Sequence, residues 1–179
     1  MSMPVYLDYN ATTPVAAEVV EAVVRAMVAG FGNPSSSYQL GREARALVED
    51  ARTAVAELIG ASTDEVCFTG CATEANNLAL LGVARSQAAD KRHLVVSAIE
   101  HPAVLEPALH LQREGWALTV VPVDGSGQVS VASVQAALRP DTALVSIMHA
   151  NNEIGTIQPI REIAELTRRR GVLLHSDAA

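Results

Sequence analysis

Four groups of polar residues in this sequence carry side chains suited to binding anions, moving protons or pairing with cations. They are Phe68–Asn77 (FTGCATEANN), Glu100 with His101, Met148–Gly155 (MHANNEIG), and Asp177 near the end of the run GVLLHSDAA. Apolar residues precede each group, as expected where a chain leaves a buried strand. Ligands of α/β proteins bind just beyond the carboxyl ends of strands. The four groups are therefore candidates for one site.

The group at Phe68–Asn77 predicts either an anion site or an ordinary helix cap. Gly70 lets the backbone turn after a strand, and Thr73 stands near the start of a helix. Free backbone N–H groups there, with a hydroxyl, would bind an anion. Alternatively, Thr73 is the N-cap and Glu74 lies in the first turn. The pattern Gly-x-x-Thr by itself favours the cap.

The next two groups contribute an imidazole and a pair of amides. His101 follows a strand and opens a helix, where its ring could stack on a flat ligand or move a proton. A lone histidine at a turn is more often only a polar turn residue. Asn151 and Asn152, followed by Glu153, give more polar side chains than a turn needs, which favours a ligand site. Asn and Gly are also common in turns, so an ordinary turn is the alternative.

Asp177 stands after a run of β-forming apolar residues. A carboxylate in that place is not expected to be buried without a partner. A cation is the simplest partner, and a protonated pyridine nitrogen would serve. Together the four groups could hold an anion, a ring face, a ring oxygen and a ring nitrogen.

Strands alternate with helices over most of the chain, which predicts an α/β fold with a mostly parallel sheet covered on both faces. Aromatic residues make up 3% of the sequence, so the core must be aliphatic. The expected strands are 65–69, 93–99, 117–123, 142–148 and 172–175. The expected helices are 16–28, 42–59, 73–85, 101–113, 131–138 and 159–170.

Composition excludes several classes of protein. The 179 residues fit one domain, and the net charge of −7 argues against nucleic acid as a direct ligand. Arg168–Arg170 is the one basic run, and it closes a helix, where cations favour the dipole. No stretch is apolar enough to span a bilayer, and the N-terminus does not resemble a signal peptide. Cys67 and Cys71 have neither disulfide nor zinc-site spacing, which favours the reducing cytoplasm.

Several motifs resemble, in order, those of one family. They are YLDYNATTP at Tyr6–Pro14, GNPSS at Gly32–Ser36, the four groups above, and HSDA at His175–Ala178. Over its whole length the chain resembles cysteine desulfurases of the NifS and IscS type, which are class-V aminotransferase-like enzymes that use pyridoxal 5′-phosphate (PLP). The resemblance implies that residues 1–179 form the incomplete N-terminal part of a three-layer PLP-dependent transferase large domain, with residues 1–13 as an arm.

The resemblance also implies roles for individual residues. Ala72 and Thr73 would bind the PLP phosphate, and His101 would stack on the ring and assist proton transfer. Asn152 would contact the ring oxygen and the substrate carboxylate, and Asp177 would pair with the ring nitrogen. In this family L-cysteine becomes L-alanine, and its sulfur passes through an enzyme persulfide to a sulfur-acceptor protein, for example in iron–sulfur cluster assembly. Family members are homodimers.

The resemblance places the Schiff-base lysine, the catalytic cysteine and the small C-terminal domain beyond Ala179, so the chain alone is expected to be inactive. Cys71 at a helix start could have a lowered pKa, yet it would lie on the phosphate side, which favours a structural role. Cys67 alternates with its neighbours in an expected strand and is predicted to be core. The alternatives are a selenocysteine lyase, another class-V enzyme, or a non-catalytic truncated paralogue that acts as a binding module.

Overall fold

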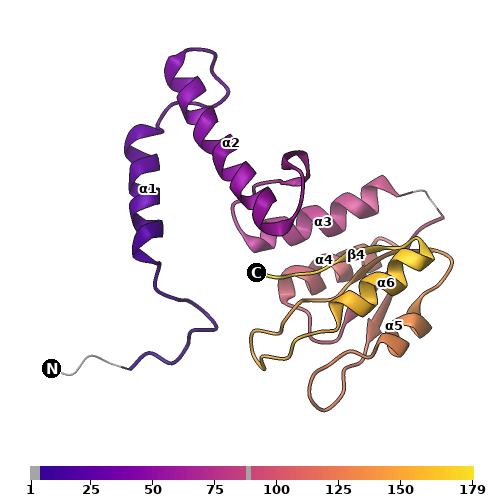
Figure 1. The fold of residues 1–179 in the computed structure, drawn as a ribbon. Coiled ribbons are helices and arrows are strands. Elements are labelled where there is room, and N and C mark those ends of the chain that lie inside the picture. Colours follow the sequence, from indigo (N-terminus) through magenta and orange to yellow (C-terminus); the bar gives the residue numbers. More distant parts are fainter. Residues whose placement is uncertain (1–4, 88–89) are drawn as a thin grey trace. The chain divides into compact units, whose positions relative to one another are not determined.

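The computed structural model describes residues 5–87 and 90–179. The chain divides into two compact units, Met1–Phe68 and Thr69–Ala179 (Figure 1). The expectation of one domain over residues 1–179 with an arm at 1–13 stays a prediction, and residues 1–4 of that arm lie outside the described residues.

The first unit is helical. It contains α1 (Ala17–Ala29), α2 (Gln39–Ile59) and the short 3₁₀ helix η1 (Thr63–Glu65). The helix α2 begins three residues before the expected Arg42 and ends at Gly60, whose φ of 68° lies in the left-handed region that glycine adopts without strain. Both helices expected here are confirmed.

The strand expected at Glu65–Thr69 is wrong. Glu65 ends η1 in a capping box with Ser62, and residues 66–69 are irregular. The carbonyl of Val66 accepts a hydrogen bond of 2.5 Å from the Arg52 guanidinium, which also lies 5.0 Å from the centre of the Phe68 ring. A β-forming pattern makes a strand only where a sheet edge is available to pair with it. Cys67 is therefore exposed, and its predicted core position is also wrong.

The second unit is built on one four-stranded sheet with the order β2-β1-β3-β4. The strands are β1 (His93–Ser97), β2 (Ala117–Val121), β3 (Thr142–Ser146) and β4 (Leu173–His175), and all neighbours are parallel. The predicted parallel sheet is confirmed. Three strands end two residues earlier than expected, at Ser97, Val121 and Ser146.

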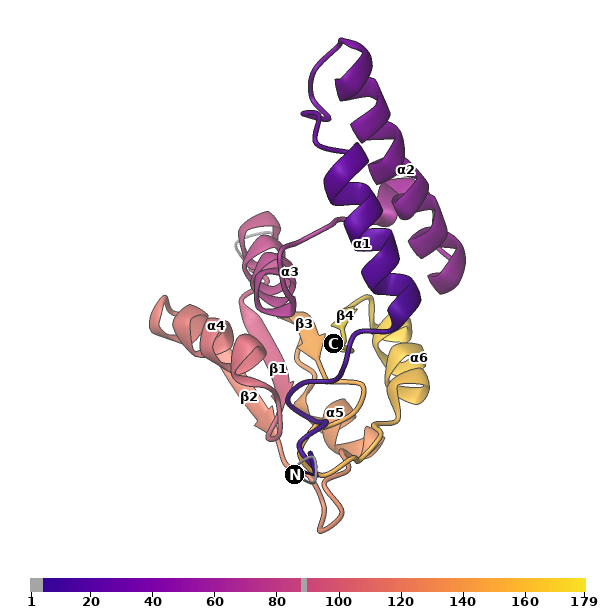
Figure 2. The ribbon, with the colours of Figure 1, turned by 90° about the vertical axis from the view of Figure 1, so that its left-hand side faces the viewer.

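Helices cover both faces of this sheet, as predicted. The helices α3 (Ala72–Ser86) and α4 (Pro102–Arg113) lie on one face, and α5 (Val131–Ala137) and α6 (Ile160–Arg170) on the other (Figure 2). Along β1, Leu94 and Val96 pack with α3 and α4, whereas Val95 packs with α5 and α6. Each of these side chains is at most 1% exposed, and burying one contributes about 1.5–3 kcal/mol.

Because all four strands are parallel, their carboxyl ends meet at one edge of the sheet. The segments that follow β1, β3 and β4 carry His101, Asn152 and Asp177 to this edge. Within the described ranges, no helix is both long and apolar enough to cross a bilayer.

Candidate functional site

The start of α3 presents unpaired backbone N–H groups. Cys71 is the N-cap, and its side chain makes no capping hydrogen bond. The N–H groups of Ala72 and Thr73 lie in the first turn, where an α-helix provides no internal acceptor. Glu74 bonds backward instead, through Oε2 to the Gly70 N–H at 2.7 Å. Thr73 is the second residue of the helix, so its alternative role as the N-cap is wrong.

His101 is the N-cap of α4. Its Nδ1 accepts a hydrogen bond of 3.0 Å from the N–H of Ala103, and Pro102 occupies the first helical position. Pro needs no hydrogen-bond acceptor there. Because Nδ1 accepts, the neutral imidazole carries its proton on Nε2. The ring is exposed, so this N–H is available to a ligand.

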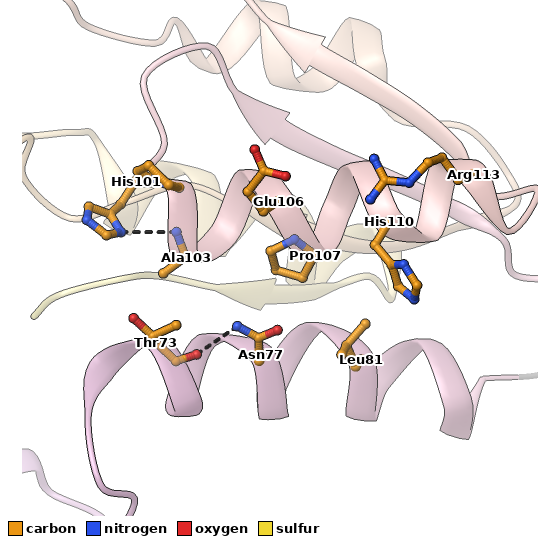
Figure 3. A pocket seen from close by; sticks show the side chains of 10 residues that line it. Thr73, Asn77, Leu81, His101, Ala103, Glu106, Pro107, His110 and Arg113 are labelled. Atoms are coloured by element: carbon orange, nitrogen blue, oxygen red, sulfur yellow. Dashed lines mark hydrogen bonds between the residues drawn. The ribbon is translucent and has the colours of Figure 1, made fainter.

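Thr73 and His101 line the same cavity, which lies between α3 and α4 and has a volume of about 500 Å³. Figure 3 shows the two side chains close to one end of this groove, with His110 and Arg113 toward the other. The structure therefore brings together the two residues that the sequence suggested for an anion and a ring face.

The two adjacent amides after β3 have different environments. Asn151 is 8% exposed, donates to the carbonyl of Ile99 at 3.1 Å, and accepts from the N–H groups of Glu153 and Ile154. Asn152 is exposed and lines a second cavity of about 490 Å³, to which His101 also contributes. Asn151 holds the loop in place, and Asn152 is the amide left for a ligand.

Asp177 is half-buried, and its carboxylate accepts hydrogen bonds from a side-chain amide and, at Oδ1, from the Ala179 N–H at 3.1 Å. Its Oδ2 accepts a hydrogen bond of 2.8 Å from Nδ2 of Asn76, which lies 101 residues earlier in the chain. No ion pair of Asp177 is found among residues 5–87 and 90–179. Burial lowers the pKa of nearby His175, whose imidazole is therefore neutral near pH 7. No protein cation therefore pairs with Asp177 in the described part of the chain, and the predicted cationic partner stays a prediction.

Asn76 was not singled out from the sequence. It is 4% exposed and lies on the buried side of α3 together with Leu80, one turn further along. A polar residue in register with the apolar side of a helix was the available signal. Because Asn76 follows Thr73 by about one turn, α3 connects the proposed anion site to the Asp177 carboxylate.

Glu100 was also missed as a separate functional residue. It is 7% exposed, and its Oε1 accepts hydrogen bonds from Ser97 Oγ at 2.5 Å and from the N–H of Met148 at 2.9 Å. Its Oε2 is buried and has no hydrogen-bond partner among residues 5–87 and 90–179. Burial raises the pKa of Glu100, and the nearby Asp177 carboxylate raises it further, whereas the hydrogen bonds from Ser97 and Met148 lower it.

Curated relatives match the chain from end to end. It is 47% identical over 178 residues to the cysteine desulfurase IscS of Dictyoglomus turgidum, and 50% identical over 182 residues to that of Stutzerimonas stutzeri. These alignments cover 99% and 100% of the chain and 45% of each relative. The chain thus spans a little under half the length of these relatives.

Solved structures give the same family. A NifS-like protein superposes with a TM-score of 0.95 at 41% identity, over 99% of this chain and 49% of the other. The structure described as SspA in complex with cysteine superposes with a TM-score of 0.93 at 38% identity, over 97% and 50% of the two chains. The sequence profile of aminotransferase class-V matches residues 5–179. With this match over nearly its whole length, the chain belongs to the class-V aminotransferase family.

Proposed function

We propose that this chain forms the cofactor-binding part of a PLP-dependent cysteine desulfurase. The observation that carries the proposal is the identity of 47–50% to cysteine desulfurases along the full chain. The comparison structure with cysteine supports an amino-acid thiol as the class of substrate. The products would be L-alanine and sulfur, the latter passed to an acceptor protein.

Class-V aminotransferases are PLP-dependent enzymes, and the residues at the sheet edge fit this cofactor. The unpaired N–H groups of Ala72 and Thr73, with the helix dipole, suit a phosphate. The Asp177 carboxylate, which has no cation from the described chain, suits a protonated ring nitrogen. The exposed side chain of His101 suits the ring face. The exposed side chain of Asn152 suits the ring oxygen and the substrate carboxylate.

Bound PLP supplies an electron sink for breaking bonds of an amino-acid substrate. Asp177 contributes a negative charge that keeps a proton on the ring nitrogen. While Nδ1 accepts from Ala103, His101 can donate a hydrogen bond at Nε2 but cannot give up that proton, since an imidazolate would remain. Moving a proton requires protonation of Nδ1 and loss of the helix cap, so the described geometry favours His101 as a hydrogen-bond donor.

Two substitutions separate the chemical role of His101 from its capping role. His101→Asn should keep the start of α4, because Asn is a good N-cap, whereas His101→Ala should lose about 1 kcal/mol of stability. Both should lower kcat by about 100-fold or more if the imidazole takes part in proton transfer. Urea unfolding and steady-state rates of the full-length protein measure the two effects. Near-normal activity of His101→Asn would reduce His101 to a cap.

The function is tested by supplying L-cysteine and PLP to the full-length protein and measuring sulfide under reducing conditions together with L-alanine. Equal amounts of the two products are expected. Activity on L-selenocysteine alone would make the protein a selenocysteine lyase, and no turnover of either would favour a binding module. The assay should use the protein at its natural length, since the chain covers 45% of its curated relatives.

We also propose a homodimer and a cytoplasmic location. The apolar side chains of Val19, Val20, Val23 and Val24 on α1 are exposed, and a further part of the protein or a second copy would cover them. Cys67 and Cys71 form no disulfide within the described part of the chain, and free thiols are the usual state of cysteines in a reducing compartment. Light scattering of the full-length protein would measure the oligomeric state.

A further inference from the structure

We infer that Glu100 is a positioning residue. It is a neutral, buried carboxylic acid that links the turn between β1 and α4 to the segment after β3. It thereby places His101 opposite Asn152. The two segments would form the walls of the cavity that these side chains line. The inference concerns the unliganded fold, and it depends on the proposed function only for its consequence in catalysis.

The two segments are fastened by a reciprocal pair of hydrogen bonds. Glu100, which follows β1, accepts from the backbone N–H of Met148 after β3 at 2.9 Å. Asn151, which follows β3, donates to the backbone carbonyl of Ile99 after β1 at 3.1 Å. Each buried side chain therefore holds the backbone of the opposite segment, and His101 and Asn152 are the next residues after Glu100 and Asn151.

The hydrogen bonds of Glu100 leave one of its two oxygens free to carry a proton. Both donors, the Ser97 hydroxyl and the Met148 N–H, approach Oε1, as they would approach a carbonyl oxygen. Among residues 5–87 and 90–179, Oε2 is fully buried and has no hydrogen-bond partner. A charged oxygen in that position is more costly than a neutral O–H, although the O–H also lacks an acceptor there.

The surrounding charges also favour the neutral acid. Titratable groups on the neighbouring segments are Asp177 and His175 at the end of β4, His149 after β3, and His101 and Glu153 at the cavity. Asp177 is the one that acts on Glu100, and it raises the pKa in the same direction as burial. With Glu100 uncharged, Asp177 is left as the carboxylate that faces a cationic ligand.

Linkage gives this pair of segments a defined pH dependence. The pKa of Glu100 is higher in the folded than in the unfolded protein. Its contribution to the free energy of unfolding is therefore complete below the unfolded pKa and is lost as pH rises through the folded pKa. The fold around Glu100 should therefore lose stability at alkaline pH, because the buried charge and its repulsion by Asp177 outweigh the stronger hydrogen bond that a carboxylate accepts from Met148. Glu100→Gln keeps the carbonyl acceptor but cannot ionise, so this contribution should no longer depend on pH.

Hydrogen exchange and infrared spectroscopy of the full-length protein without substrate test the inference. In Glu100→Met, which has a similar volume but no strong acceptor, exchange of the segment 147–153 should speed up by about tenfold or more. Glu100→Gln should stay within about twofold of the wild type at neutral pH and should remove the extra loosening of this segment at alkaline pH. The wild type should show the carbonyl band of a protonated carboxyl group at pH 7, and Glu100→Gln should lack it.

Glu165→Gln is the matched control, because Glu165 on α6 has an exposed side chain whose ion pair among the described residues is with Arg161, at 3.8 Å. It should change neither the infrared band nor the exchange of 147–153. Absence of the protonated-acid band from the wild type would overturn the inference, as would unchanged exchange in Glu100→Met. If Glu100→Met does not fold, the band and the pH profile of Glu100→Gln decide the matter. None of these readouts needs turnover, so a failure of the desulfurase proposal would not affect them.

Discussion

Asp177→Asn is expected to lower kcat/KM for sulfide release by at least about 100-fold, which corresponds to about 2.7 kcal/mol of transition-state stabilisation. The substitution removes the negative charge proposed to hold a proton on the PLP ring nitrogen. The new amide oxygen can still accept the hydrogen bond from Asn76, and among the described residues only the exposed hydrogen bond from the Ala179 N–H to Oδ1 is lost with the charge. Stability should therefore remain near that of the wild type while the electron-accepting power of the cofactor falls.

The measurement uses the full-length protein with saturating PLP, so that weaker cofactor binding is separated from slower chemistry. Asp50→Asn on α2 is the control for loss of one carboxylate charge, since Asp50 is exposed and makes no hydrogen bond or ion pair among the described residues. It should leave kcat/KM unchanged. Activity of Asp177→Asn within a few fold of the wild type would mean that the carboxylate does not act on the ring nitrogen.

The alternating architecture could be predicted from the sequence because it depends on local patterns. The apolar runs at β1 and β3, separated by amphipathic helices and glycine turns, specify a parallel sheet wherever they occur. Residues 65–69 show the limit of this reasoning. They have strand-forming composition, but a strand also needs a partner strand, and the four-stranded sheet does not include them.

The candidate site could be predicted only in part, for a similar reason. The parallel sheet alone requires that His101, Asn152 and Asp177 meet at one edge. Which polar residue turns inward is a tertiary property, so composition could not distinguish Asn151 from Asn152, and resemblance to a family pointed to the exposed one. Glu100 had no separate signal in the sequence, because the adjacent His101 was the more obvious candidate for chemistry.

Asn76 is the residue that most clearly required the structure, and it gives the second large expected effect. Its amide is the side-chain donor to Asp177 Oδ2, and it lies 4% exposed at a position that Leu can fill with little change in volume. Asn76→Leu removes a hydrogen bond to a charged group, which contributes about 1.5–3 kcal/mol. We expect kcat/KM to fall by about 10- to 100-fold, through misplacement of the Asp177 carboxylate.

A double-mutant cycle distinguishes this indirect role from a general loss of packing. If Asn76 acts through Asp177, then Asn76→Leu should have little further effect on kcat/KM in the Asp177→Asn background, which gives a coupling energy of about 1.5–3 kcal/mol. Gln112→Leu, at an exposed position of α4, controls for replacing an amide by leucine and should be neutral. Additive effects of the two substitutions would contradict the model. Such additivity would mean that Asn76 stabilises α3 but does not orient the carboxylate, because the effect of Asn76→Leu on kcat/KM would then be the same with and without the Asp177 carboxylate.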